Sequence, residues 1–183
     1  LGYMFDLGEE VEQDIEKAIG YYEKGVELGE GSSAGNLAYL YRYGEGVEQD
    51  LAKAVEYYEI GVSLGHGLSM NNLAYMYLMG DQIQQDYEKA LYWWEKAAEQ
   101  GDVRAQYNVG DMYNDGEGTE VNYEKALYWF EKAAEQGDVG AQYNVGYMYY
   151  NGEGTEVNYK KALYWYEKAA EQGDVDAQFE TAD

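Results

Sequence analysis

The stretch KALYWFEKAAEQGDV runs from Lys125 to Val139, and close copies of it begin at Lys89 and Lys161. A catalytic site is normally built once, whereas a phrase that recurs indicates a repeated structural unit. The copies are 36 residues apart, and Lys17 and Lys53 extend the same register toward the start of the chain. Self-comparison therefore predicts an array of repeats with a period of 36 residues and no insertion that breaks it.

Each repeat is predicted to form two helices, as the unit 105–140 illustrates. Its first helix carries apolar residues at helical spacing, namely Ala105, Val109, Met112 and Tyr113. We expect Gly116 to end this helix and Asn122, after the loop GEGTEV, to cap the second one. The second helix is expected to bury a stripe of Ala126, Trp129, Phe130, Ala133 and Ala134. Gly137 should end it, and Asp138 should cap the first helix of the next repeat.

One such hairpin cannot bury its own apolar faces, but a stack of hairpins can. Small residues such as Gly110, Ala133 and Ala134 would let the two helices approach closely while aromatic rings fill the gaps. The sequence therefore predicts an all-α solenoid of about five helix-turn-helix repeats. We expect one continuous domain over 1–183, divided into a partial repeat 1–32, repeats 33–68, 69–104, 105–140 and 141–176, and a stub 177–183.

The repeat resembles a known family. The pattern A-x-x-x-V-G-x-x-Y-x-x-G-x-G, followed by Lys125-Ala126, Trp129-Phe130, Lys132-Ala133-Ala134, Gly137 and Ala141, is similar to the Sel1-like repeat (SLR), a relative of the tetratricopeptide repeat. The resemblance covers the whole chain. It implies a right-handed superhelix that serves as a protein-binding scaffold or adaptor, with no enzymatic activity and no cofactor. The pattern departs at Gln82, which stands where the second loop glycine is expected, so that loop should differ.

The charge of the chain narrows the classes of partner. It contains 36 acidic and 12 basic residues, for a formal net charge of −24 at pH 7. Nucleic-acid phosphates and anionic membranes would be repelled, whereas a basic protein would be attracted. The chain has no Cys and no apolar run long enough to span a bilayer. With no signal segment visible, we expect a soluble protein of the bacterial cytoplasm or periplasm.

Three motifs favour structural rather than chemical roles. GEGTEV begins like a dinucleotide-binding loop, but it lacks the third Gly and follows a helix instead of a strand. The segment 111–122 partly matches a calcium loop, yet Tyr113 occupies the third position and Asn122 the twelfth. His66 is the one histidine, so it cannot form a usual zinc site, and we expect it at the surface of a helix start. The sequence thus predicts no metal site and no catalytic site.

Two sets of tyrosines lie on different faces of the first helices. Tyr41, Tyr77, Tyr113 and Tyr149 match the structural tyrosine of the family and are expected in the core. Tyr39, Tyr75 and Tyr147 come two positions earlier and therefore point elsewhere. A binding surface and a structural surface are equally good interpretations for this second set.

Differences between the copies indicate the working surface. Units 105–140 and 141–176 differ at six positions, and three of these, Asp111/Tyr147, Asn114/Tyr150 and Asp115/Asn151, share one helix face at i, i+3 and i+4. Exposed positions of the second helix such as Glu131, Lys132, Glu135 and Gln136 do not change between these copies. We therefore expect the first-helix face to bind the partner; the alternative is that six differences are too few to interpret.

The family resemblance places the first helices on the concave side of the superhelix. Asn36, Asn72, Asn108 and Asn144 recur in one column, where they either hold a bound peptide's backbone or form structural hydrogen bonds between helices. The candidate concave-face residues are Asn36, Tyr39, Arg42, Tyr43, Asn71, Asn72, Tyr75, Leu78, Arg104, Tyr107, Asn108, Asp111, Asn114, Asp115, Tyr143, Asn144, Tyr147 and Tyr150.

The leading hypothesis is a non-enzymatic scaffold or adaptor that binds a protein or peptide, with a basic one favoured by the charge. The alternative is an acidic inhibitor that mimics nucleic-acid charge and blocks a basic nucleic-acid-binding protein, as an anti-CRISPR-like or other counter-defence protein would. Salt dependence of binding separates the two hypotheses. Neither hypothesis includes direct nucleic-acid binding or membrane insertion.

Overall fold

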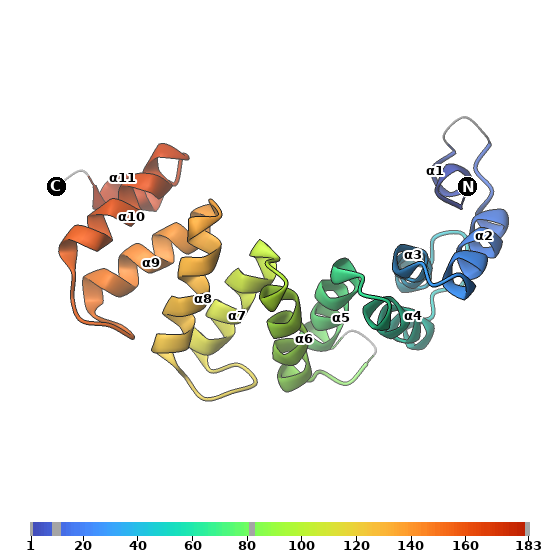
Figure 1. The fold of residues 1–183 in the computed structure, drawn as a ribbon, viewed down its shortest axis with the longest axis horizontal. Coiled ribbons are helices and arrows are strands. Elements are labelled where there is room, and N and C mark those ends of the chain that lie inside the picture. Colours follow the sequence, from blue (N-terminus) through green and yellow to red (C-terminus); the bar gives the residue numbers. More distant parts are fainter. Residues whose placement is uncertain (1, 9–11, 81–82, 182–183) are drawn as a thin grey trace. The chain divides into compact units, whose positions relative to one another are not determined.

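The computed structural model describes residues 2–8, 12–80 and 83–181, and within these ranges the regular structure is entirely helical (Figure 1). The first helices of the repeats are α1 (Gly2–Leu7), α3 (Gly31–Tyr43), α5 (Gly67–Met79), α7 (Val103–Asp115), α9 (Val139–Asn151) and α11 (Val175–Glu180). The second helices are α2 (Ile15–Glu27), α4 (Leu51–Ser63), α6 (Tyr87–Glu99), α8 (Tyr123–Glu135) and α10 (Tyr159–Glu171). From α2 onward both series keep the period of the sequence, which confirms the two-helix repeat.

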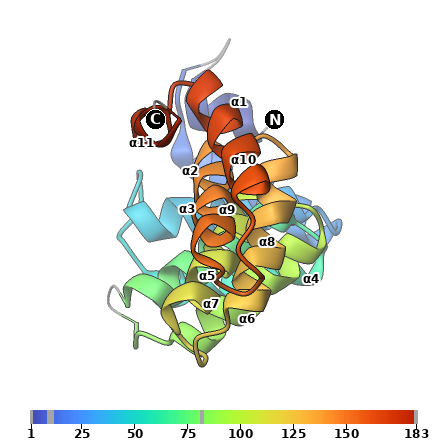
Figure 2. The ribbon, with the colours of Figure 1, turned by 90° about the vertical axis from the view of Figure 1, so that its left-hand side faces the viewer.

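The helices form two compact units, Leu1–Asp86 and Tyr87–Asp183, which are called unit 1 and unit 2 below. In unit 1, α3 packs against both α2 and α4, and α4 also packs against α5. In unit 2, each helix from α6 to α11 packs against the next one along the chain (Figures 1 and 2). The expectation of one continuous domain over 1–183 stays a prediction.

The helix ends of unit 2 follow the capping residues that the sequence supplies. The side chain of Asn122 accepts a hydrogen bond from the Lys125 N–H at 3.0 Å, and Asp138 accepts one from the Ala141 N–H at 2.8 Å. Gly116 ends α7 in the left-handed conformation, with φ 75°. Because these groups satisfy backbone donors and acceptors that a helix end leaves open, the turn positions predicted from the sequence are confirmed.

The loop motif G-x-G has a packing role. A Cβ on Gly118 would lie 2.5 Å from the carbonyl carbon and oxygen of Tyr87, at the start of the second helix of the preceding repeat. Gly154 approaches the backbone of Tyr123 in the same way. The loop therefore crosses a neighbouring helix start too closely for any side chain, which confirms the inter-helix-turn interpretation of GEGTEV. The predicted departure at Gln82 falls outside the described residues.

The core of unit 2 forms between the two helix series. The stripe predicted for α7 is confirmed, since Ala105, Val109, Met112 and Tyr113 are all buried. Gly110 lets α8 approach, because a Cβ there would lie 2.7 Å from the Cδ1 of Phe130. Buried Ala126, Ala133 and Ala134 complete the predicted stripe of α8.

One member of the predicted α8 stripe was wrong. Trp129 is only half-buried, and Leu127 occupies the buried face instead. Leu127 precedes Phe130 by three residues and so shares its face, whereas Trp129 is displaced by about 100° around the helix. The Trp129 ring lies at the edge of the core, in edge-to-face contact with Tyr128 at a centroid distance of 5.0 Å.

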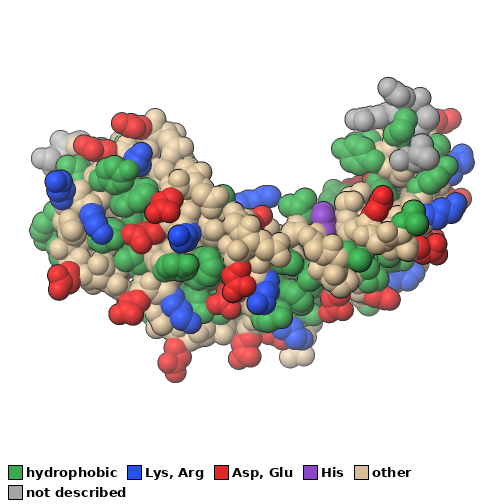
Figure 3. Space-filling model, in the orientation of Figure 1, with side chains coloured by type: hydrophobic (Ala, Val, Ile, Leu, Met, Phe, Trp, Pro, Cys, Tyr) green, Lys and Arg blue, Asp and Glu red, His purple; other side chains and the backbone are tan. Residues whose placement is uncertain are grey.

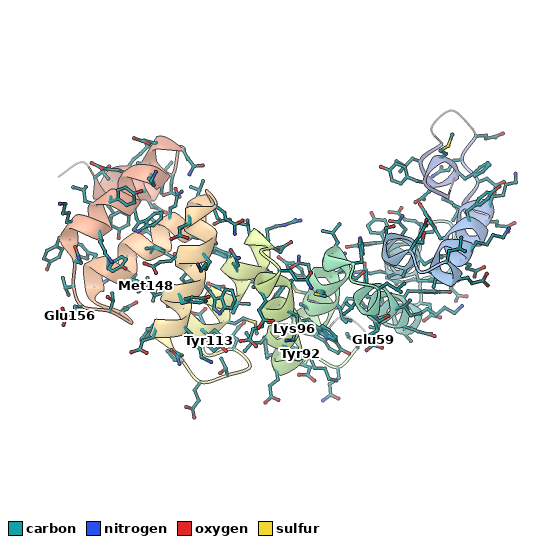
Figure 4. The ribbon with its side chains drawn as sticks, viewed as in Figure 1. Glu59, Tyr92, Lys96, Tyr113, Met148 and Glu156 are labelled. Atoms are coloured by element: carbon teal, nitrogen blue, oxygen red, sulfur yellow. The ribbon has the colours of Figure 1, made fainter. Side chains whose placement is uncertain are left out.

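The structural tyrosines link consecutive repeats in unit 2. The Tyr113 hydroxyl donates to Glu95 Oε1 at 2.6 Å and accepts from Lys125 Nζ at 3.0 Å. Tyr149 repeats this arrangement with Glu131 at 2.7 Å and Lys161 at 2.8 Å. Figure 4 shows Tyr113 among the side chains of unit 2. The core prediction is confirmed for these two tyrosines.

The structural tyrosines of unit 1 are less buried than those of unit 2. Tyr41 and Tyr77 are half-buried, which corrects the expectation that all four structural tyrosines lie in the core. The Tyr41 ring stacks on Tyr57 at 5.8 Å, and Lys53 Nζ lies 4.7 Å from the Tyr41 ring centroid. The second helices of unit 1 carry looser sequences, so fewer bulky groups close over these rings.

His66 stands at the N-cap of α5, the predicted helix start, but its side chain is only partly exposed. Its ring is half-buried and presses against α3, since a Cβ on Gly35 would lie 2.6 Å from His66 Cε1. Its Nδ1 lies 2.8 Å from the Ser69 hydroxyl oxygen. This burial lowers the pKa of His66. The absence of a side chain at Gly35 creates the space that draws the ring inward.

Two further observations concern the described residues only. Within 2–8, 12–80 and 83–181, no group of three or more His, Cys, Asp or Glu side chains is arranged to hold a metal ion. No helix in those ranges has the length and apolar character needed to cross a membrane.

Candidate functional site

A groove of about 410 Å³ opens in unit 2 along the first-helix side of α7 and α9. Its lining residues are Tyr107, Asp111 and Asn114 of α7, Tyr143, Asn144, Tyr147 and Met148 of α9, Tyr123 and Phe130 of α8, and Glu153 of the following loop. Met148, labelled in Figure 4, is buried and contributes to the floor. We call this feature the α7–α9 groove.

Helix periodicity aligns the walls of the α7–α9 groove. Tyr107, Asp111 and Asn114 follow one another at i, i+4 and i+7, which places them on one face of α7. On α9, Tyr143 and Tyr147 are separated by four residues and also share a face. The sequence predicts all five of these residues as partner-binding residues, and the structure brings them to one groove.

Two glycines make room for the aromatic rings that lie behind the groove. The Tyr107 ring lies 5.5 Å from Phe130, which occupies the space that Gly110 leaves free. The Tyr143 ring lies 5.4 Å from Tyr166, which packs against Gly146 in the same way. The close helix approach therefore supports the aromatic walls from behind, and the walls are held by core packing rather than by a loop.

The electrostatics of the groove are dominated by carboxylates. Partial desolvation raises the pKa of Asp111, and the negative charges of Asp115 and Glu117 raise it further. The side chain still reaches solvent at the mouth of the groove. Burial also raises the pKa of Tyr107, with a further contribution from Asp111, while the amide of Asn144 lowers it. The residues that line the groove thus include two carboxylates and no basic side chain.

Basic residues of unit 2 lie elsewhere. Every lysine between 87 and 183 belongs to a second helix, and the first helices carry only Arg104. Lys96 lies over the ring of Tyr92 at 5.9 Å, as Figure 4 shows, and Lys132 lies over Tyr128 at 5.7 Å. Figure 3 shows acidic side chains spread over the displayed face with exposed hydrophobic groups between them.

The remaining candidates of unit 2 lie outside the groove lining. Arg104 and Asp115 are exposed, and Asp115 accepts a hydrogen bond from the Asn114 amide at 2.8 Å. Tyr150 is exposed and contacts the Tyr159 ring at 5.4 Å. Asn108 is half-buried, and its Nδ2 has no hydrogen-bond partner in the described structure. The two interpretations of the asparagine column, peptide binding and a structural hydrogen bond, both stay predictions.

The candidates of unit 1 do not form an equivalent groove among the described cavities. Tyr39 and Tyr43 are exposed on α3 with their rings 4.6 Å apart, and the guanidinium of Arg42 lies 5.2 Å from the Tyr43 ring centroid. Tyr75 is exposed on α5, and Asn72 and Leu78 are half-buried there. Asn36 lines a separate cavity of about 460 Å³ near Tyr3, Tyr21 and Tyr22.

Asn71 lies differently from the expected surface position. Its side chain is buried, and neither amide atom has a hydrogen-bond partner in the described structure. Its column holds Gly35, Tyr107 and Tyr143 in the other repeats. A tyrosine at this position is long enough to extend past the packed helices to the surface, whereas the shorter asparagine stays between them.

Four lining residues were missed by the sequence reasoning. Periodicity assigns Phe130 to the core, and it assigns Met112, the counterpart of Met148 one repeat earlier, to the core as well. Both Phe130 and Met148 also line the groove. Tyr123 and Glu153 come together because the loop after α9 packs onto the start of α8 through Gly154. The sequence signal for this contact was the second glycine of G-x-G. A glycine is needed where the backbone passes too close to a neighbouring segment for a side chain to fit.

The two-helix units at a fixed period define a helical-repeat protein of the scaffold class. The chain belongs to the Sel1 repeat family, which matches residues 1–30, 32–66, 67–102, 103–138 and 139–174. Members of this family generally act as protein–protein interaction scaffolds and are typically non-enzymatic. The family identification from the sequence is confirmed.

Solved structures agree with this assignment. A protective antigen from uropathogenic Escherichia coli with an SLR fold is 33% identical, with a TM-score of 0.91 over 98% of this chain and 38% of that one. A Sel1 repeat protein from Oxalobacter formigenes is 31% identical, with a TM-score of 0.86 over 97% of this chain and 73% of that one. Cysteine rich protein B of Helicobacter pylori is 28% identical, with a TM-score of 0.54 over 72% of this chain and 94% of that one.

The chain thus spans well under half of the Escherichia coli structure that it resembles. No curated protein matches the chain significantly.

Proposed function

We propose that this protein is a non-enzymatic scaffold that binds an extended segment of a partner protein on its first-helix face, with the α7–α9 groove as the principal contact in unit 2. The observation that carries the proposal is the gathering of variable first-helix residues around one concavity. Asp111, Asn114 and Tyr147 differ between otherwise near-identical repeats, and all three line the groove. The general scaffold role of the Sel1 repeat family supports the same conclusion.

The chemistry of the groove suits a polypeptide. Tyrosine rings offer large, stiff contact area with a polar tip, as at many protein interfaces. The Asn144 amide lines the groove, and the Asn108 Nδ2 is a donor without a partner in the described structure. Such amides can bond the backbone of an extended chain while neighbouring side chains select its sequence.

The proposal is tested on a partner captured from extract of the native host and identified by mass spectrometry. Affinity for the purified partner is then compared for the wild type, the double variant Asn108→Ala/Asn144→Ala and Tyr147→Ala. Loss of amide contacts or of an exposed ring at an interface centre should weaken binding by about 10-fold or more. Circular dichroism and thermal unfolding establish that each variant is folded.

Tyr128→Ala is the matched control. Tyr128 is 53% exposed on a second helix, and Tyr147 is 46% exposed on a first helix, so the two substitutions remove similar ring surface. We expect Tyr128→Ala to leave affinity within about 2-fold of the wild type, because most residues outside an interface centre are energetically neutral. Weakening by Tyr128→Ala but not by Tyr147→Ala would assign binding to the second helices and refute the proposal.

Salt dependence distinguishes the groove from an acidic mimic of nucleic acid, which the net charge of −24 also allows. A mimic that replaces many phosphate contacts should lose about 10³-fold or more in affinity between low and moderate salt. A groove that relies on rings, amides and one or two carboxylates should lose far less. A steep salt slope together with insensitivity to Tyr147→Ala would favour the mimic.

A further inference from the structure

Helix α7 carries a carboxylate where four other first helices carry a tyrosine. The positions equivalent to Asp111 are Tyr3, Tyr39, Tyr75 and Tyr147 in the other repeats and Asp183 in the C-terminal stub. Each of the helices α1, α3, α5 and α9 therefore presents a tyrosine at the position where α7 presents Asp111. In α7 the substitution places a carboxylate among the rings of Tyr107, Tyr123, Tyr143 and Tyr147.

The Asp111 carboxylate has no counter-ion. None of the ion pairs between described residues involves it, and Arg104, the one base on the first helices of unit 2, lies seven residues away on α7. The neighbouring charges are negative: Asp115 and Glu117 raise the pKa of Asp111, and Glu153 also lines the groove. Asp111 is exposed to solvent in a groove that four tyrosines also line, so a cation bound there would meet both a carboxylate and aromatic faces.

We infer that the α7–α9 groove is a pocket for one arginine side chain of the bound segment, with Asp111 as its counter-ion and the surrounding tyrosines as its walls. This inference rests on the proposed function and specifies the residue that the groove selects. A guanidinium is planar, stacks on aromatic faces and forks onto a carboxylate with two parallel hydrogen bonds.

Other occupants fit the groove less well. An acidic side chain would be repelled by Asp111 and Glu153, and an apolar one would desolvate Asp111 without compensating its charge. A lysine supplies the charge but lacks the flat surface that stacks on the rings of Tyr107 and Tyr147. The combination of flat walls and one unpaired carboxylate therefore favours arginine over lysine.

The first arm of the test measures side-chain selectivity. The full chain, labelled with ¹⁵N, is titrated with the peptide acetyl-Ser-Gly-Arg-Gly-Ser-amide and followed by NMR amide shifts. The same peptide with citrulline, a neutral isostere, and with lysine serve as controls. We expect shifts concentrated on α7 and α9 and at least about 5-fold weaker binding of the citrulline peptide, from loss of a charge-assisted hydrogen bond. The lysine peptide should bind with intermediate affinity.

The second arm tests the counter-ion with a matched pair of variants. Asp111→Asn and Glu135→Gln each remove one negative charge from unit 2, but only Asp111 lines the groove, whereas Glu135 is exposed on the second helix α8. Asp111→Asn should weaken binding of the arginine peptide by about 5-fold or more, and Glu135→Gln by no more than about 2-fold. Because its neighbours disfavour ionised Asp111, Asp111→Asn should unfold at the same or a higher urea concentration than the wild type, so loss of binding would not reflect loss of fold.

Each outcome decides the inference. Equal weakening by Asp111→Asn and Glu135→Gln would show general charge attraction and overturn it, as would equal binding of the arginine and citrulline peptides or shifts away from α7 and α9. If these results appear while the captured partner still requires Tyr147, the arginine pocket is wrong and the proposed scaffold function stands. If the partner is insensitive to Tyr147→Ala as well, both fail.

Discussion

Replacing Gly118 by alanine should destabilise unit 2 much more than the same change at Gly137, although both glycines have positive φ. Gly118 has φ 70° and Gly137 has φ 94°, so an alanine is strained at either position. The surroundings differ. A Cβ on Gly118 would lie 2.5 Å from the Tyr87 carbonyl, whereas a Cβ on Gly137 would have no heavy atom within 4 Å. The pair therefore separates backbone strain from the close approach between repeats.

The expected magnitudes follow from these two terms. Left-handed backbone costs a non-glycine residue about 1–2 kcal/mol, and both variants carry this cost. Forcing an extra carbon into a packed site costs a further amount of about 1–3 kcal/mol. This second cost applies only to Gly118→Ala, because a backbone group occupies the space there. We expect Gly118→Ala to lower the free energy of unfolding by about 2–5 kcal/mol and Gly137→Ala by about 1–2 kcal/mol.

The assay is urea unfolding of the full chain followed by far-ultraviolet circular dichroism. With a denaturant slope of about 2 kcal/mol per molar urea, a difference of about 2 kcal/mol separates the two midpoints by about 1 M. The comparison requires equal slopes for both variants, since a changed slope would indicate loss of cooperativity between repeats. Coincident midpoints would mean that the loop does not depend on its contact with the preceding repeat, and would refute the reasoning.

The remaining predictions concern a pair of helical glycines, the structural tyrosine Tyr113 and His66. Gly20→Ala should stabilise the protein by about 0.5–1 kcal/mol, because this helical glycine has open space around its Cβ, whereas Gly110→Ala should destabilise it by driving a Cβ into a buried ring; urea midpoints measure both. Tyr113→Phe should cost about 1–2 kcal/mol through loss of its two hydrogen bonds, measured by the same assay, and an unchanged midpoint would show that water replaces them at no cost. His66 has a lowered pKa, so its unfolded form binds the proton more tightly; its contribution to stability is complete above about pH 6.5 and is lost as the pH falls toward the lower folded pKa. His66→Gln should flatten the pH dependence of the unfolding midpoint in that window, and an unchanged profile would contradict this assignment.

The fold could be predicted from the sequence because its signals are local and repeated. Asn122, Gly116 and Asp138 act within one turn of the backbone, so capping chemistry alone located the helix ends. The apolar stripe of α7 was also recovered, since helical periodicity assigns a face without knowledge of what covers it. Five copies of one pattern reinforce each local signal, which is why the helix order and family were predicted together.

The placement of individual rings depended on packing partners that the period does not reveal. Trp129 was expected in the core and lies at its edge, because the space near Gly110 admits only the ring that faces it. His66 was expected outside and lies half-buried, because Gly35 on another helix leaves a gap. Both differences involve a contact between separate helices.

The sequence by itself determined the 36-residue period, the two helices of each repeat, their caps and the positions at which the copies differ. Tertiary structure alone decided that Tyr123 and Glu153 close the same groove as Asp111 and Tyr147. It also decided that Asp111 has no counter-ion among the described contacts. The physical reason is that capping and periodicity act over a few bonds, whereas a groove and its unpaired charge arise from the distance between helices, which close packing of side chains from several repeats determines.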